Sequence, residues 1–305
     1  MPTHYLPDQM ADERRETLTS EQTRIHITQR TRAWNRKPVV TVTDALDFWS
    51  AAASAANVVM QLSWPEVGYG VAESRVHSGA LMYHPWKRLR TTAQYMAVAI
   101  LGTDEERRAY RDAVNVAHRQ VHSTQESPVK YNAFNRELQL WVAACLFIFY
   151  EDTYQLLHGK LTDEQAETFY QSAMPIGTTL QVTEEMWPAS RKDFDVYWNR
   201  ACERIEVDDF VRGFLLELID LKMINVVLRI ILAPLLRFLT IGFLAPVFRQ
   251  QLGVEFTETD RRRFEHLFLF VAVVNRFIPK GLRTYNYTVL MTDLRWRLKR
   301  KKPLI

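Results

Sequence analysis

The chain has 305 residues, of which 47% are hydrophobic and 24% charged, and this balance predicts a globular protein with a large core. The formal net charge of +4 is small, and no basic stripe with interleaved aromatic residues precedes the last dozen residues, so the composition argues against a nucleic-acid-binding protein. Cys145 and Cys202 lie outside any Cys/His cluster. They therefore argue against a zinc site or a disulfide framework and favour a reducing compartment.

The first 35 residues are polar and mixed in charge, and we expect a loose N-terminal arm there. Arg14 and Arg15 resemble the start of a twin-arginine export signal. No apolar segment follows them, so the sequence predicts a cytoplasmic protein.

Helix signals recur along the chain, whereas the alternation typical of strands does not. The predicted helices include one from Thr43 to just before Pro65, one ending at Gly102, and an apolar one over residues 137–157 that we expect at the centre of the fold. Three further helix starts carry the residues of a capping box: Thr103 with Glu106, Thr162 with Gln165, and Thr257 with Asp260. The sequence therefore predicts an all-α fold with a single domain over residues 36–290 and a basic tail over 291–305.

Residues 223–248 are apolar enough to raise the question of a membrane span. Arg229 and Arg237 lie inside this segment, and Pro234 is expected to split it into two short halves. We therefore expect two buried helices or one surface-associated hairpin. The tail "LRWRLKRKKPLI" is expected to be solvated or to make a weak peripheral contact with anionic lipid.

Two histidines stand four residues apart in "VNVAHRQVHS", a spacing that places His118 and His122 on one face of a helix. His118 borders the apolar stripe of this helix and is expected to face inward, whereas His122 is expected to face solvent. The zinc-protease motif is absent because Arg119 stands where that motif needs a glutamate. His118 alone is consistent with either a core histidine or a metal ligand.

The neighbours of His118 favour a ligand role. Arg88, Thr92, Tyr95 and Ala99 share one face of the preceding predicted helix. The short turn at residues 102–103 folds the next helix back against it, so Arg88 and His118 are expected to reach a common pocket.

The blocks "MQLSWPEVGYGVAESR", "HPWKRLRTTAQYM" and "VNVAHRQV" follow one another in this order. Together with "YNAFNRELQLWV" and "LTDEQAETFYQSAMPIGTTL" they resemble the family of the bacterial rubber oxygenases (latex clearing proteins) and the MpaB-type oxygenases. The resemblance covers roughly residues 45–285. It implies a globin-like helical core that encloses haem b.

The resemblance also implies roles for four residues. His118 corresponds to the axial iron ligand, Arg88 and Thr92 to haem-contacting and catalytic residues, and Glu73 to a base. The chain departs from the family pattern at Trp64 and Ser74, where many members have histidines. Glu73 matches the family glutamate only to within one residue.

A further departure is Thr91, which stands where rubber-cleaving members can carry an iron-capping lysine. From these residues we expect a haem-dependent oxygenase that inserts dioxygen into an apolar, unsaturated lipid-like or isoprenoid substrate. Polymeric rubber is not the expected substrate, because no export signal was found. The alternatives are a non-catalytic helical haem- or lipid-binding protein and a haem-free metalloenzyme that uses His118 and His122. The sequence leaves the oligomeric state open.

Overall fold

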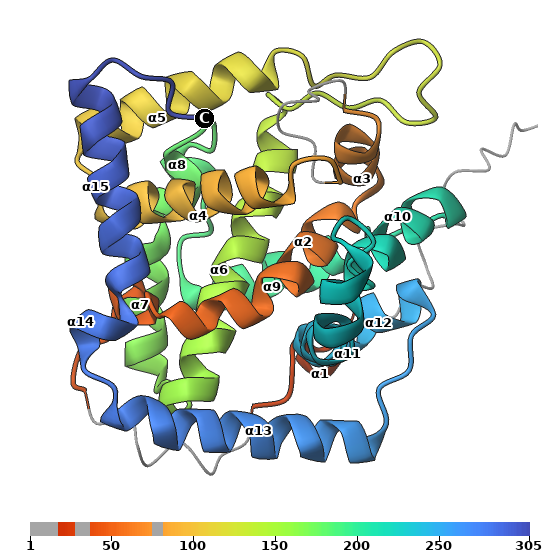
Figure 1. Ribbon diagram of the computed structural model, residues 1–305, viewed down its shortest axis with the longest axis vertical. Coiled ribbons are helices and arrows are strands. Elements are labelled where there is room, and N and C mark those ends of the chain that lie inside the picture. Colours follow the sequence, from red (N-terminus) through yellow and green to blue (C-terminus); the bar gives the residue numbers. More distant parts are fainter. Residues whose placement is uncertain (1–17, 28–36, 75–81) are drawn as a thin grey trace, which may run out of the picture.

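The computed structural model describes residues 18–27, 37–74 and 82–305 (Figure 1). The only strand-like pairing in these ranges is one antiparallel bridge between His122 and Asn132. The predicted all-α class is confirmed. The α-helices are α1 (Ser20–Thr23), α2 (Ser54–Leu62), α3 (Pro65–Ala72), α4 (Pro85–Leu101), α5 (Asp104–His118), α6 (Arg136–His158), α7 (Asp163–Ala173), α8 (Pro175–Thr178), α9 (Arg191–Cys202), α10 (Asp209–Ile219), α11 (Val226–Phe243), α12 (Pro246–Leu252), α13 (Glu258–Phe277), α14 (Lys280–Arg283) and α15 (Tyr285–Lys299). Short 3-10 helices are η3 (Val42–Ala45), η4 (Phe48–Ala53) and η6 (Glu184–Met186).

Helix α6 runs through the middle of the bundle, with α4 crossing it, α13 below and α15 along one side (Figure 1). It packs against α2, α8, α13, η3 and η4, and almost every residue from Leu138 to Leu157 is buried. Its first half is apolar on nearly every side, as a helix enclosed by others requires. The prediction of a central helix over residues 137–157 is confirmed.

The predicted helix boundaries next to the site are confirmed. Helix α4 ends at Leu101 with Gly102 as its C-cap, and α5 starts with the predicted capping box. The Thr103 hydroxyl accepts the Glu106 amide hydrogen at 3.2 Å, and the Glu106 side chain accepts the Thr103 amide hydrogen at 2.9 Å. The boxes at the starts of α7 and α13 form in the same way. Because these signals are satisfied within one helical turn, the sequence alone determines them.

Three stacked indoles form the middle of the core. The ring centroids of Trp64 and Trp141 lie 4.8 Å apart and those of Trp141 and Trp198 lie 5.2 Å apart. Each of the three indole N–H groups donates to a backbone carbonyl at 2.9–3.0 Å. Since the buried polar atoms are paired, the stack joins the start of α3 to α6 and α9 without a desolvation penalty.

The predicted helix start at Thr43 is wrong. The segment instead forms η3 and η4, and a regular α-helix begins only at Ser54. The reason lies at Asp47, whose carboxylate accepts the Trp49 amide hydrogen and also binds Asn275 and Arg283 at 3.1 and 3.0 Å. These partners are distant in sequence, so they interrupt the helix in a way that no local pattern indicates.

The predicted break at Pro234 is also wrong, because α11 is one helix with this proline inside it. Proline removes the hydrogen bond to the carbonyl four residues earlier, which belongs to Ile230. Ile230 is 70% exposed, so the loss occurs outside the packed core, where it costs least. Only the end of α11, from Leu239 to Phe243, is buried. Among the described residues, α11 is the one helix with the length and composition of a membrane span.

The structure describes part of the predicted N-terminal arm and all of the predicted C-terminal tail. Residues 1–17 and 28–36 of the arm lie outside the described residues, whereas α1 packs against α9 and α12. At the other end, α15 packs along α4 and buries Met291 and Leu294, and Leu304 beyond it is also buried. The boundaries at residues 35 and 290 stay predictions.

Candidate functional site

His118 is the last residue of α5, and its ring is half-buried. Its Nδ1 atom is buried and has no hydrogen-bond partner among the described residues. The ring meets Phe134 edge-on, with 6.2 Å between centroids. Burial, and then the nearby Arg88, lower the pKa of His118 to about 4, although a helix C-terminus by itself favours the charged form. The imidazole is therefore neutral near pH 7, which is the form that binds metal ions.

His122 lies apart from His118. Helix α5 ends before it, and His122 is an exposed residue that forms a β-bridge with Asn132. The prediction that the two histidines share one helical face is wrong, because the chain leaves the helix at residue 119. In the described part of the chain, no cluster of three or more His, Cys, Asp or Glu side chains could hold a metal ion. The arrangement therefore does not favour a two-histidine metal site.

Arg88 lies in the first turn of α4 and approaches His118 closely enough for their charges to interact. Its side chain is exposed by surface area, yet burial lowers its pKa, with an opposing contribution from Tyr110. The guanidinium therefore stands beside protein atoms without being packed against them. No carboxylate pairs with it in the described ranges.

Thr92 follows Arg88 by one helical turn and is half-buried. Its hydroxyl forms no hydrogen bond within the described ranges, whereas the neighbouring Thr91 donates to the Arg88 carbonyl at 3.1 Å. Further along this face, the buried Tyr95 donates to the Ile176 carbonyl at 2.5 Å. The predicted face of α4 therefore points toward the protein interior. At the N-terminal end of this face, Arg88 presents a cation and Thr92 a hydroxyl.

Glu73 is the C-cap of α3 and is held by a neighbouring loop. Its Oε2 atom accepts hydrogen bonds from the Ser127 hydroxyl at 2.7 Å and the Tyr131 hydroxyl at 2.9 Å. Gly70 lies close to the Tyr131 ring, since a Cβ atom there would be 3.3 Å from it. The described contacts do not bring Glu73 together with Arg88 or His118.

A chain of side-chain amides beside His118 was not anticipated from the sequence. Gln181 donates to the Asn115 side chain at 2.8 Å, and Gln139 donates to Gln181 at 2.6 Å and to the Ala133 carbonyl at 2.6 Å. Asn115 precedes His118 by three residues, so these bonds fix the end of α5 against α6. The three residues are far apart in sequence, and their contact was not predicted, although Asn115 falls within "VNVAHRQV" and Gln139 within "YNAFNRELQLWV".

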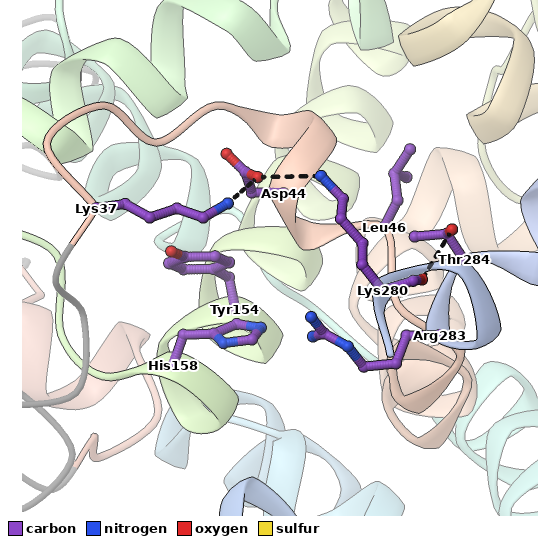
Figure 2. A pocket seen from close by; sticks show the side chains of 8 residues that line it. All are labelled: Lys37, Asp44, Leu46, Tyr154, His158, Lys280, Arg283 and Thr284. Atoms are coloured by element: carbon purple, nitrogen blue, oxygen red, sulfur yellow. Dashed lines mark hydrogen bonds and ion pairs between the residues drawn. The ribbon is translucent and has the colours of Figure 1, made fainter. Parts of the chain in front are cut away.

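A separate cavity of about 110 Å³ lies at the far end of α6 (Figure 2). Asp44 pairs there with Lys37 and Lys280, and Arg283 pairs with Asp47 at 3.0 Å. This cavity has room for a few water molecules, each of which occupies about 30 Å³, but not for a porphyrin. Because its charges are paired within the protein, the surroundings of His118 are the better candidate. The cavity is lined by Lys37, Asp44, Leu46, Tyr154, His158, Lys280, Arg283 and Thr284.

Comparison with known proteins places the chain in a family. A family model described as "ER-bound oxygenase mpaB/B'/Rubber oxygenase, catalytic domain" matches residues 43–275, a range that contains Glu73, Arg88, Thr92 and His118. Two uncharacterized proteins, Mb2261 of Mycobacterium bovis and Rv2237 of Mycobacterium tuberculosis, are each 45% identical over 251 residues. The alignments cover 82% of this chain and 98% of either relative. No solved structure matches the chain.

Proposed function

Because this chain belongs to the family of MpaB-type and rubber oxygenase catalytic domains, we propose that it is a haem b-dependent oxygenase that inserts dioxygen into an apolar, unsaturated lipid-like or isoprenoid substrate. The observation that carries the proposal is the His118 ring, which is neutral and has a buried nitrogen without a partner among the described residues. A neutral imidazole is a common axial ligand of haem iron. When bound, the haem would supply the oxidising power.

The residues around His118 fit such a group chemically. A buried ring nitrogen without a partner costs about 1–3 kcal/mol, and coordination is one way to recover that cost. Arg88 offers a cation with no carboxylate partner among the described residues, which suits a haem propionate or another anionic oxygen. Thr92 offers a hydroxyl one turn away, and the amide chain from Asn115 to Gln139 would hold the ligand helix in place.

Glu73 is proposed as a base because it matches the family glutamate. The hydroxyls of Ser127 and Tyr131 orient its carboxylate, and a carboxylate in a fixed position can accept a proton from a substrate held beside it. Both hydroxyls donate to Oε2, so the second carboxylate oxygen, Oε1, would accept the proton.

The proposal is tested by dioxygen consumption with a panel of unsaturated fatty acids and isoprenoids. We expect the full chain to consume dioxygen with at least one class. His118→Ala should reduce the rate at least a hundredfold, whereas the matched variant His122→Ala should keep it within twofold. Full haem occupancy without dioxygen consumption across the panel would contradict the oxygenase and favour the non-catalytic binding protein. Localisation in the cytoplasm stays a prediction.

A further inference from the structure

The first ten residues of α11 expose an unusually wide apolar surface. Val227, Ile230 and Ile231 are 67%, 70% and 67% exposed, and their apolar neighbours on the helix are exposed as well. We call this surface the α11 arc. It consists of Val226, Val227, Leu228, Ile230, Ile231, Leu232, Pro234 and Leu235.

The width of the arc limits what can cover it. At 3.6 residues per turn, its members occupy roughly 240° of the helix circumference. Within residues 226–236 only Arg229, Ala233 and Leu236 lie outside the arc, and each of them is half-buried. A helix that packs against one protein surface buries a stripe of about 100°, so a single docked surface would leave much of the arc in water. A fluid apolar medium such as lipid hydrocarbon can surround the arc on all of its exposed sides.

The size of the arc also argues against a second copy as its partner. Ten residues of helix extend about 15 Å and offer eight apolar side chains. A stable protein–protein interface uses about 20–30 residues on each side. The arc supplies less than half of that number, and most of α10 and α12 beside it is buried or polar.

The charges near the arc suit lipid headgroups. The sequence has no Asp or Glu between Asp220 and Glu255. Of the four cationic residues in this stretch, Lys222 and Arg237 pair with Glu217 and Asp220, which precede it. Arg229 has no ion-pair partner within the described ranges and lies at the edge of the arc, where a long side chain can reach a phosphate while the apolar residues enter hydrocarbon.

From these observations we propose that the α11 arc inserts into one leaflet of a lipid bilayer and anchors the protein at the membrane surface. A helix about 10–12 Å thick fits within one leaflet, since the hydrocarbon core is about 30 Å thick. The helix does not span the bilayer, because Leu239–Phe243 at its other end is buried in the protein core. This anchor is distinct from the basic tail, and it does not depend on haem or on catalysis.

The first test is flotation of the full chain with vesicles of phosphatidylcholine, with and without an anionic lipid. We expect binding to both, and at least a tenfold lower bound fraction for Ile230→Glu combined with Ile231→Glu. The matched control is Val196→Glu on α9, which alters a residue that is 66% exposed elsewhere and should bind as the unaltered chain does. Failure of the unaltered chain to bind either vesicle would overturn the proposal.

The second test places a fluorescent probe on the arc and needs no disruptive change. Cys145 and Cys202 are buried, at 0% and 1% exposure, so Ile231→Cys can be labelled selectively, with Val196→Cys as the control. Vesicles should shift the emission of the probe at position 231 to the blue, and spin-labelled lipids should quench only this probe. Two results would overturn the proposal: lipid-free protection of position 231 from an aqueous quencher, or a dimer that the paired glutamate substitutions dissociate without any effect of lipid.

Discussion

Two polar regions of this helical bundle differ in how their side chains are paired. Around Glu151 on α6, the Arg191 guanidinium donates two hydrogen bonds to the carboxylate at 2.7 and 2.9 Å, and Arg24 donates a third at 2.7 Å. Around His118, the ring nitrogen Nδ1 and the Arg88 guanidinium have no such partners among the described residues. The Glu151 carboxylate is fully paired, although the Nε atom of Arg24 beside it has no hydrogen-bond partner among the described residues. Since buried polar groups are normally paired, His118, whose main polar atom lacks a partner, gains more from a ligand.

The pKa shifts show the same contrast. Burial opposes ionisation of Glu151, but Arg24 and Arg191 outweigh it, so the pKa of Glu151 lies below its ordinary value. At His118 burial and the neighbouring cation act in the same direction, and the pKa falls to about 4. The region around Glu151 therefore keeps its groups charged. The region around His118 keeps the imidazole neutral and able to bind a ligand.

The largest expected effect comes from breaking the ion pairs around Glu151. Glu151→Gln removes the charge that two buried guanidinium groups share, and it should lower the free energy of unfolding by about 3–5 kcal/mol in urea titrations. The control is Glu137→Gln, which alters a carboxylate that is 58% exposed and should cost less than about 1 kcal/mol. Equal losses for the two variants would mean that the Glu151 cluster has no special structural role.

His158 has the same lowered pKa as His118 but lies outside the candidate site, so it tests the effect of burial alone. Burial, followed by Arg283, lowers the pKa of His158 to about 4, so the unfolded chain binds its proton at a higher pH than the folded chain does. The free energy of unfolding should therefore fall as the pH drops from about 6.5 towards 4, by up to about 3 kcal/mol from this residue. His158→Gln should remove this part of the fall in urea titrations at pH 7 and 4.5. The same pH dependence in both proteins would refute this contribution.

The amide chain should matter both for stability and for the position of the ligand helix. Gln181→Ala removes the side-chain partner of Asn115 and one of the partners of Gln139, and it should cost about 1–3 kcal/mol. It should also shift the absorption maximum of bound haem, because the end of α5 is no longer fixed. Gln171→Ala, at an exposed glutamine of α7, is the control and should change neither quantity. An unchanged spectrum for Gln181→Ala would show that the chain only stabilises the fold.

The smallest expected effect on stability is at His118 itself. In the haem-free chain, His118→Leu replaces a partnerless ring nitrogen by an apolar side chain of similar size, so the free energy of unfolding should stay within about 1 kcal/mol or rise. Urea titration of the haem-free variant measures this. A loss above about 2 kcal/mol would indicate that His118 has a structural partner, as the Glu151 carboxylate does.

Local features of the fold were predictable from the sequence, and long-range ones were not. The capping boxes and the stop at Gly102 are satisfied within one turn of helix, so their residues suffice. The sequence wrongly predicts a helix start at Thr43, because the partners of Asp47 that interrupt the helix lie in α13 and α14. The continuity of α11 through Pro234 depends on the exposure of its first half, which no sequence pattern reports.

The same distinction applies to the candidate site. The approach of Arg88 to His118 followed from a short turn between two helices, and the structure places the two within range of each other. The end of α5 before His122 was missed, because a helix stop without glycine or proline leaves no local mark. The hydroxyls that hold Glu73 come from a loop fixed by tertiary contacts, so their identity could not be read from spacing.

The most direct test of the central claim is the absorption spectrum of the full chain after titration with haem. If His118 is the axial ligand, the unaltered chain and His122→Ala will show a Soret band at one haem per chain, and His118→Ala will lose it or require at least a hundredfold more haem. An unaltered chain that binds no haem, or a His118→Ala variant with the same band and affinity, would contradict the account.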